Sequence, residues 1–251
     1  MGESSKWYKD AKPFLNTPAV IFQLFIGLDK KGKELDDLPW HLVRAFSSNR
    51  DVGKVYKEYL SLSLEEALDT DIQLYGYTSP SIKDPTYEER HPGKATLEAF
   101  ALANNDWFKS WQHLPVKKRG DDYDGLKKAF GQKILEKILD IYPHLKDHVD
   151  CLVYGTSAAA NFYLNRNAGG GAKLENTRAR MCLEASAKMR ADSGIPGLYL
   201  TGEDILVNSV VFSSISGALT ASEILGRNVV IEAFALKSLK ILKRHFFGSG
   251  K

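Results

Sequence analysis

The feature that most limits the fold of this chain is an apolar run at residues 19–28, AVIFQLFIGL. The run follows Pro18, is rich in β-branched and aromatic side chains, and is closed by Gly27 and the loop LDKKGKELDD. Such a run predicts a strand that is buried on both faces. With 251 residues, the chain is long enough to bury a core around that strand, as one large domain or two small ones.

Further strands and helices alternate along the sequence without strict βαβ regularity, which predicts a mixed α/β or α+β fold. Residues 95–103 fit a helix by composition and a strand by position. Loops are expected at 155–161 and 165–180, and a charged loop around Asp121, Asp122 and Asp124. Residues 195–204 predict a short buried strand that enters an acidic turn. The other strands are expected at 72–78 and 149–154, and helices at 51–60, at 63–68 with a Ser63–Glu66 capping box, at 126–142 and through 216–227.

Composition and charge exclude several classes of protein. The 34 basic and 31 acidic residues nearly balance, so nothing points to nucleic-acid binding. No run of 18 uninterrupted apolar residues occurs, so a membrane-spanning helix is not expected. Residues 1–13 lack the apolar segment of a secretory signal.

Cysteine and histidine positions do not form a recognisable metal motif. Cys151 and Cys182 have no CxxC spacing and are expected to be buried thiols. His144 and His148 are four residues apart, but Pro143 interrupts the helix and no third ligand is evident. The sequence therefore predicts no metal site.

Four short motifs carry a resemblance to a known family. They are PSIKDPT at 80–86, WFKSW at 107–111, KRGDDY at 118–123 and LYLTGED at 198–204. In this order they resemble the C-terminal part of the retinol saturase and carotenoid isomerase family of FAD-dependent oxidoreductases, over residues 20–227. The resemblance implies a substrate domain with a mixed sheet and helices at 1–190, followed by the last strand and helix of an FAD-binding domain at 191–228.

The LYLTGED segment is the candidate cofactor site. Its glycine lets backbone approach a ligand, and the next helix would point its N-terminal amides at the turn. The resemblance implies FAD contacts from these residues: Thr201, Gly202, Glu203, Asp204 and Gly217. From the residue types alone, Asp204 equally suits an acidic cap that satisfies helix amides. No catalytic residue is predicted.

Several positions depart from the family pattern. Members of the family begin with a G-x-G-x-x-G dinucleotide fold, whereas the glycine cluster here, residues 169–171, follows a loop. We therefore expect the N-terminal Rossmann portion to be absent and FAD not to be bound by this chain alone. Phe212 stands where a glycine is expected beneath the flavin, and SAAAN at 157–161 replaces a polar segment. The cofactor site is expected to be degenerate.

The tail at 229–251 predicts a basic amphipathic helix. Lys237, Lys240, Lys243 and Arg244 lie on other faces than its apolar stripe of Ile231, Leu236, Leu239, Leu242 and Phe246. Such a helix suits a membrane surface or an acidic partner, and a terminal helix docked on its own domain is the alternative.

Two functions follow as expectations. The first is a truncated, non-catalytic accessory subunit of a larger membrane-associated assembly, with other protein chains as partners and with lipid or carotenoid contact. The second is one half of a split FAD-dependent oxidoreductase that acts on a retinoid or carotenoid. A plastid is the favoured compartment, with the endoplasmic reticulum as the alternative.

Overall fold

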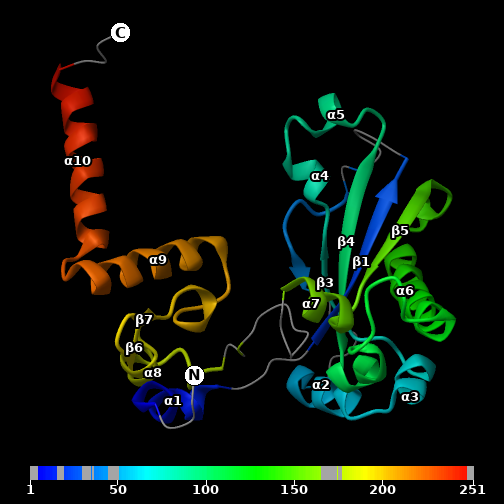
Figure 1. Ribbon diagram of the computed structural model, residues 1–251. Helices are drawn as coiled ribbons and strands as arrows, with labels where there is room; N and C mark the ends of the chain where they lie inside the picture. Colours follow the sequence, from blue (N-terminus) through cyan, green and yellow to red (C-terminus); the bar gives the residue numbers. More distant parts are fainter. Residues whose placement is uncertain are drawn as a thin grey trace. The chain divides into compact units, whose positions relative to one another are not determined.

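A computed structural model describes residues 5–15, 20–29, 35, 37–44, 51–164, 174 and 177–247, apart from the side chains at 243, 244, 246 and 247. The chain divides into two compact units (Figure 1). The sheet unit comprises residues 19–171, and the helical unit comprises residues 1–18 together with 172–251. The glycine cluster at 169–171 and most of the basic loop expected at 165–180 lie outside the described residues.

A five-stranded sheet forms the centre of the sheet unit, which confirms the mixed α+β class. Every strand pairing among the described residues is antiparallel, in place of the mixed sheet that the resemblance implied. In Figure 1 the two longest strands, β4 and β1, lie side by side. The strands, in their order across the sheet, are β2 (Val43–Arg44), β3 (Leu74–Thr78), β4 (Ala95–Ala103), β1 (Val20–Leu28) and β5 (Val149–Gly155).

Strand β1 alternates between buried and more accessible residues. Phe22, Leu24 and Ile26 are buried, whereas Phe25 between them is exposed. The prediction of burial on both faces is therefore wrong, because one face of this antiparallel sheet packs on the core and the other stays open. The segment at 95–103 is a strand, β4, and its whole length pairs with β1.

The long helix α6 (Asp121–Ile141) covers the packed face of the sheet. Phe130, Ile134 and Ile138 are buried in its core-facing stripe, and the rings of Phe130 and Phe22 are 4.8 Å apart. The helix begins five residues before the predicted start, directly after Gly120 at φ 88°. The aspartates expected in a charged loop form its acidic first turn, where carboxylates favour the positive end of the helix dipole.

Shorter helices complete the sheet unit. The predicted capping box is confirmed, since the Ser63 hydroxyl accepts from the Glu66 amide and the Glu66 carboxylate accepts from the Ser63 amide. The prediction of a loop at 155–161 is wrong in part, because helix α7 begins at Ser157. These helices are α2 (Val52–Leu60), α3 (Leu64–Asp69), α4 (Pro80–Lys83), α5 (Tyr87–Arg90), η3 (Asn105–Trp111), η4 (Pro143–His148) and α7 (Ser157–Leu164).

The helical unit has a small core of its own. Ala11 and Phe14 pack with Ala185 and Met189, so the N-terminal residues and residues 172–190 group with the segment after them. The predicted boundary at residue 190 differs from this division. The elements are α1 (Lys6–Ala11), η1 (Lys12–Phe14), α8 (Leu183–Lys188), β6 (Asp192–Ile195), β7 (Leu198–Tyr199), η5 (Gly202–Asp204), α9 (Val210–Leu225) and α10 (Val229–Phe247).

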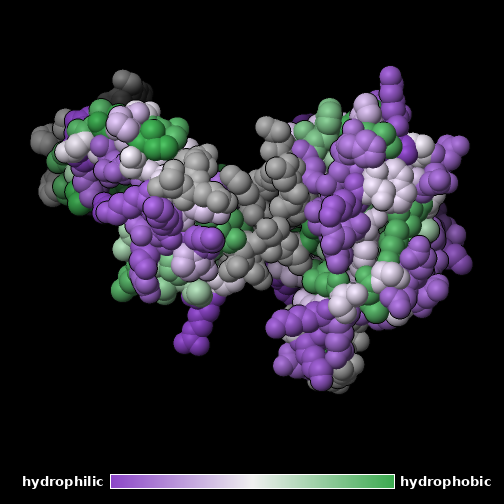
Figure 2. All heavy atoms as spheres, turned by 60° about the horizontal axis from the view of Figure 1, so that its bottom comes forward, coloured by the Kyte–Doolittle hydropathy of each residue, from purple (hydrophilic) through white to green (hydrophobic). Residues whose placement is uncertain are grey.

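Apolar side chains reach the surface in both units. Figure 2 shows green patches between hydrophilic areas, including on the part that carries the C-terminal helices. Among the helices in the described parts of the chain, none combines the length and the apolar character needed to cross a bilayer.

Candidate functional site

The turn at Thr201–Gly202 is the centre of the predicted cofactor site. Gly202 adopts φ 86°, a left-handed conformation that favours glycine. Its amide donates a 2.8 Å hydrogen bond to the hydroxyl of Ser216, and the Thr220 hydroxyl donates to the Leu200 carbonyl at 2.9 Å. These two bonds fix the turn to helix α9.

The strand that leads into this turn is not the buried strand that the sequence predicted. Residues 192–199 form a two-stranded hairpin, β6–β7, with Gly194 and Gly197 at positive φ. Leu198 and Tyr199 of β7 are both exposed. An apolar pair on an exposed hairpin edge is a surface that other protein can cover.

Arg180 contacts the residues that follow the turn, and the sequence patterns did not single it out. Its guanidinium donates to the carbonyls of Glu203 and Leu206, the latter at 2.9 Å. The side chain is almost fully buried, and this burial lowers the pKa of Arg180, an effect that the nearby carboxylates of Asp204 and Glu203 oppose. A single cation therefore organises residues 203–206.

Asp204 lies within this arrangement. One of its carboxylate oxygens, Oδ1, is shielded from solvent, and its charge interacts with Arg180. Thr201 is exposed, while Gly202 and Glu203 are half-buried. Added Cβ atoms at Gly202 or Gly217 would meet nothing within 4 Å. The two glycines thus leave room for a neighbouring group, whereas the Asp204 carboxylate interacts with Arg180 of its own unit.

The N-terminus of α9 is satisfied from within the chain. The Ser209 hydroxyl accepts the Phe212 amide at 3.0 Å, as an N-cap. Val210 and Phe212, which are 86% and 44% exposed, place apolar side chains at this helix start. Together with Asp204, this arrangement does not offer a flavin the polar contacts expected here, so we derive no chemical step through that cofactor.

The open face of the sheet is a second candidate surface. Val153, Phe25 and Glu98 pair in register across β5, β1 and β4, and so point to the same side. Val153 and Phe25 are exposed, and burial raises the pKa of the Glu98 carboxyl. The result is an apolar face with a half-buried acid in its middle.

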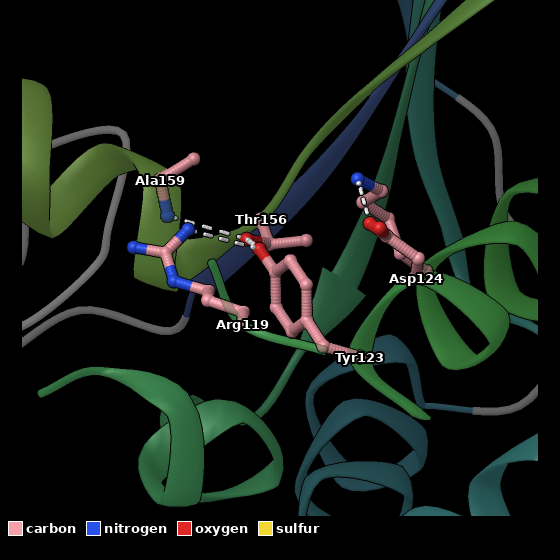
Figure 3. Close-up of polar contacts among 6 residues, drawn as sticks. Arg119, Tyr123, Asp124, Thr156 and Ala159 are labelled. Atoms are coloured by element: carbon pink, nitrogen blue, oxygen red, sulfur yellow. Dashed lines mark hydrogen bonds and ion pairs between the residues drawn. The ribbon is translucent and has the colours of Figure 1, made fainter. Parts of the chain in front are cut away.

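A buried polar network explains the KRGDDY motif (Figure 3). The Tyr123 hydroxyl and the Thr156 hydroxyl are 2.5 Å apart, and Thr156 also accepts the Ala159 amide at 3.2 Å. Arg119 donates to the Ala158 carbonyl at 3.0 Å and to Tyr123 at 3.4 Å. The motif therefore fixes the start of α7 to α6. The Ser157 hydroxyl, also buried there, has no hydrogen-bond partner among the described residues.

The other two motifs of the sheet unit also form scaffold. Trp107 and Phe108 of the WFKSW motif are buried, and the Trp107 indole donates to the Leu62 carbonyl at 2.9 Å. In the PSIKDPT motif, Asp84 accepts the amide of Thr86 at 2.9 Å and pairs with Arg90. These contacts hold loops in place.

The cysteines and histidines have local roles. Both cysteines are exposed free thiols, so the prediction of buried thiols is wrong: β5 lies at a sheet edge, and Cys182 precedes a short surface helix. His148 lies 3.2 Å from Asp29, and His144 lies 3.5 Å from Asp37. No group of three or more metal-binding side chains occurs in the described part of the chain.

One cavity of about 320 Å³ lies in the helical unit. Trp7 contributes to its wall and donates through its indole to the Arg190 carbonyl at 3.0 Å. The charged lining residues have mixed signs and are Lys6, Asp10, Lys188, Arg190, Asp192 and Glu223. None of the predicted cofactor residues lines it.

Comparison with known proteins supports the resemblance that the motifs indicated. No protein-family model matches the sequence. The chain is 36% identical over 214 residues to the all-trans-retinol 13,14-reductase of Danio rerio, which is 85% of this chain and 35% of that protein. It is 36% identical over 181 residues to the Homo sapiens protein of the same name, with shares of 71% and 29%.

A third relative is named as inactive. The inactive all-trans-retinol 13,14-reductase of Danio rerio is 27% identical over 232 residues, which is 89% of this chain and 37% of that protein. The chain thus spans about a third of the length of the curated relatives it matches. It resembles the retinol saturase family.

Proposed function

We propose that this chain, which resembles the retinol saturase family, is a non-catalytic accessory subunit of a larger membrane-associated assembly. Relatives named all-trans-retinol 13,14-reductase support the family, and one relative with inactive in its name supports a member without that activity. The proposed role uses the fold as a scaffold and a docking surface. No residue of the chain is assigned to catalysis.

The observation that carries this proposal is the start of helix α9. The Ser209 hydroxyl accepts the hydrogen bond of the Phe212 amide. Val210 and Phe212 present apolar side chains where a flavin would need polar contacts and space. Asp204 interacts with Arg180 inside its own unit. The motifs that hold the fold, in contrast, keep their buried contacts, as with Arg119 and Tyr123.

Exposed apolar side chains support a protein partner for the helical unit. Leu183 and Val210 are almost fully exposed, and Leu198 and Tyr199 are exposed on the hairpin. Apolar surface of this extent on a folded unit marks an interface more often than free surface. Other chains of the assembly would cover it.

Flavin content tests the proposal. The native assembly is purified from its source by affinity capture on this chain, and its visible absorption and all-trans-retinol reduction are measured, with an active retinol saturase purified in parallel. We expect no flavin absorption and no reduction. Flavin bound in a 1:1 ratio to this chain, together with reduction, would contradict the accessory role.

A second candidate function has one observation in its favour. Gly202 and Gly217 leave open space around the turn, which suits a cofactor held mainly by another chain or by sequence outside residues 1–251. In this alternative the chain shapes the pocket for a retinoid or carotenoid, and FAD supplies the redox chemistry. Thr201, Gly202, Glu203, Asp204 and Gly217 would then line the cofactor.

The two candidates separate in one variant. Gly217→Val would fill the open space beside the turn. In a split flavoenzyme it would lower the flavin content, whereas in an accessory subunit it would leave assembly with the partner chains unchanged. Ile224→Val, at an exposed position of the same helix whose side chain makes no hydrogen bond, is the control. We place the assembly on a plastid membrane, with the endoplasmic reticulum as the alternative, and organelle fractionation distinguishes them.

A further inference from the structure

Helix α10 has an apolar surface that no other described part of the chain covers. Its large apolar side chains are between 50% and 68% exposed, and none of them belongs to either hydrophobic core. A terminal helix docked on its own unit would bury this stripe. These side chains are Ile231, Phe234, Leu236, Leu239, Ile241 and Leu242.

Charge is arranged around the helix in a defined way. At 3.6 residues per turn, Lys240 lies about 180° around the helix from Ile231, and Lys237 lies about 120° from it. Phe234, Ile241 and Leu242 lie on the side of Ile231, and both lysines are exposed. The helix therefore has an apolar side and a cationic side, and Leu236, about 140° from Ile231 and about 40° from Lys240, lies on the cationic side.

The charge of this segment has one sign. Residues 233–247 contain four lysine or arginine residues and no aspartate or glutamate. The acidic residue before them, Glu232, lies 3.5 Å from Arg227. From residue 233 on, the charge beside the apolar side is thus positive alone.

The helix is fixed at its start. The Asn228 side chain accepts the Ile231 amide at 3.0 Å, and the Val229 amide donates to the Ser222 hydroxyl of α9 at 3.0 Å. Gly226 ends α9 in the left-handed conformation, at φ 61°. A helix that is already formed loses less conformational entropy when its apolar side is buried.

We propose that α10 lies along the surface of a bilayer that contains anionic lipids. Its apolar side chains would enter the acyl boundary, while Lys237 and Lys240 would stay at the level of the headgroups, where their stems cover apolar surface. The single sign of charge favours an anionic lipid surface over an uncharged one. This inference deepens the proposed membrane association and does not depend on whether the chain binds flavin.

Vesicle co-sedimentation of the full chain tests the inference. Two kinds of vesicle are used, phosphatidylcholine alone and phosphatidylcholine with about 30% phosphatidylserine, an anionic lipid that gives the surface a negative potential. We expect binding to the second kind, weakened by added salt. Ile231→Glu with Phe234→Glu lowers binding at least tenfold, because two apolar anchors are lost. Lys237→Gln and Lys240→Gln each lower binding to anionic vesicles by about fivefold.

A matched control keeps the test specific. Trp40→Glu changes an exposed apolar side chain of the sheet unit and leaves binding unchanged, and circular dichroism checks that each variant keeps its helix content. Binding to neither kind of vesicle, or binding that the α10 variants leave intact, would overturn the proposal. A dimer that Ile231→Glu dissociates, without vesicle binding, would overturn it in favour of a second copy of this chain.

Discussion

Two glycines of helix α6 should respond in opposite directions to the same substitution. A Cβ at Gly131 would lie 2.2 Å from Cε1 and 2.4 Å from Cδ1 of the Tyr154 ring, which packs across the helix. A Cβ at Gly125, six residues earlier in the helix, would meet nothing within 4 Å. Gly125→Ala is therefore the matched control for Gly131→Ala.

The magnitudes follow from these distances. Alanine stabilises a helix interior by about 0.8–1 kcal/mol relative to glycine, so Gly125→Ala should raise the free energy of unfolding by up to that amount. Gly131→Ala gains the same propensity but forces the Tyr154 ring to move by more than an ångström, and overpacking costs about 1–3 kcal/mol. The two variants should differ by about 1–3 kcal/mol, because the propensity contribution cancels between them.

Urea unfolding followed by tryptophan fluorescence measures this difference, with equal slopes required for each variant. Tyr154→Ala provides a second check, since it removes the ring that Gly131→Ala would meet. In that background Gly131→Ala should become neutral or stabilising. If Gly131→Ala stabilises the chain as much as Gly125→Ala does in the presence of Tyr154, the packing of α6 on β5 described here is wrong.

Three further predictions concern single side chains. Tyr123→Phe removes the hydroxyl that contacts Thr156 at 2.5 Å and should lower the free energy of unfolding by about 1–2 kcal/mol; unchanged urea unfolding would refute a role for this bond. Burial raises the pKa of Glu98 above its ordinary 4.5, so the folded state favours its neutral form, and the resulting stabilisation is present below pH 4.5 and lost as pH rises through the folded pKa. Glu98→Gln should therefore be more stable than the parent at pH 7 and lose that advantage at pH 4, and a pH-independent difference in unfolding midpoint would count against it. Ser63→Ala breaks the capping box and should cost about 1 kcal/mol, measured by the same unfolding experiment, where no change would contradict the cap.

Local patterns in the sequence were enough to predict much of the sheet unit. The apolar spacing of Phe130, Ile134 and Ile138 predicts the helix that is α6, and Ser63 with Glu66 predicts the capping box of another helix, α3; both are confirmed. Composition did not separate strand from helix at 95–103, because the alanines and leucines there suit both. Pairing with β1 decides for a strand, and such pairing depends on residues far apart in the sequence.

The candidate site was less predictable for the same reason. The turn at Gly202 follows from a glycine between a strand and a helix, but Arg180, 22 residues earlier, reaches its carbonyls only through the fold of the helical unit. The apolar character of Leu198 and Tyr199 predicted a buried strand, yet the hairpin leaves both side chains exposed. The hydrophobicity of a side chain predicts that it will be buried. It does not indicate whether this chain or a partner chain buries it.

The central claim is that a retinol saturase-like fold here does not work as a flavoenzyme. The most direct measurement is the flavin content of the native assembly captured on this chain, read as visible absorption per mole of chain. We expect none, because the Ser209 hydroxyl caps the N-terminus of α9 and Phe212 places an apolar ring there. Flavin at one equivalent, lost in Gly217→Val and kept in Ile224→Val, would contradict this expectation.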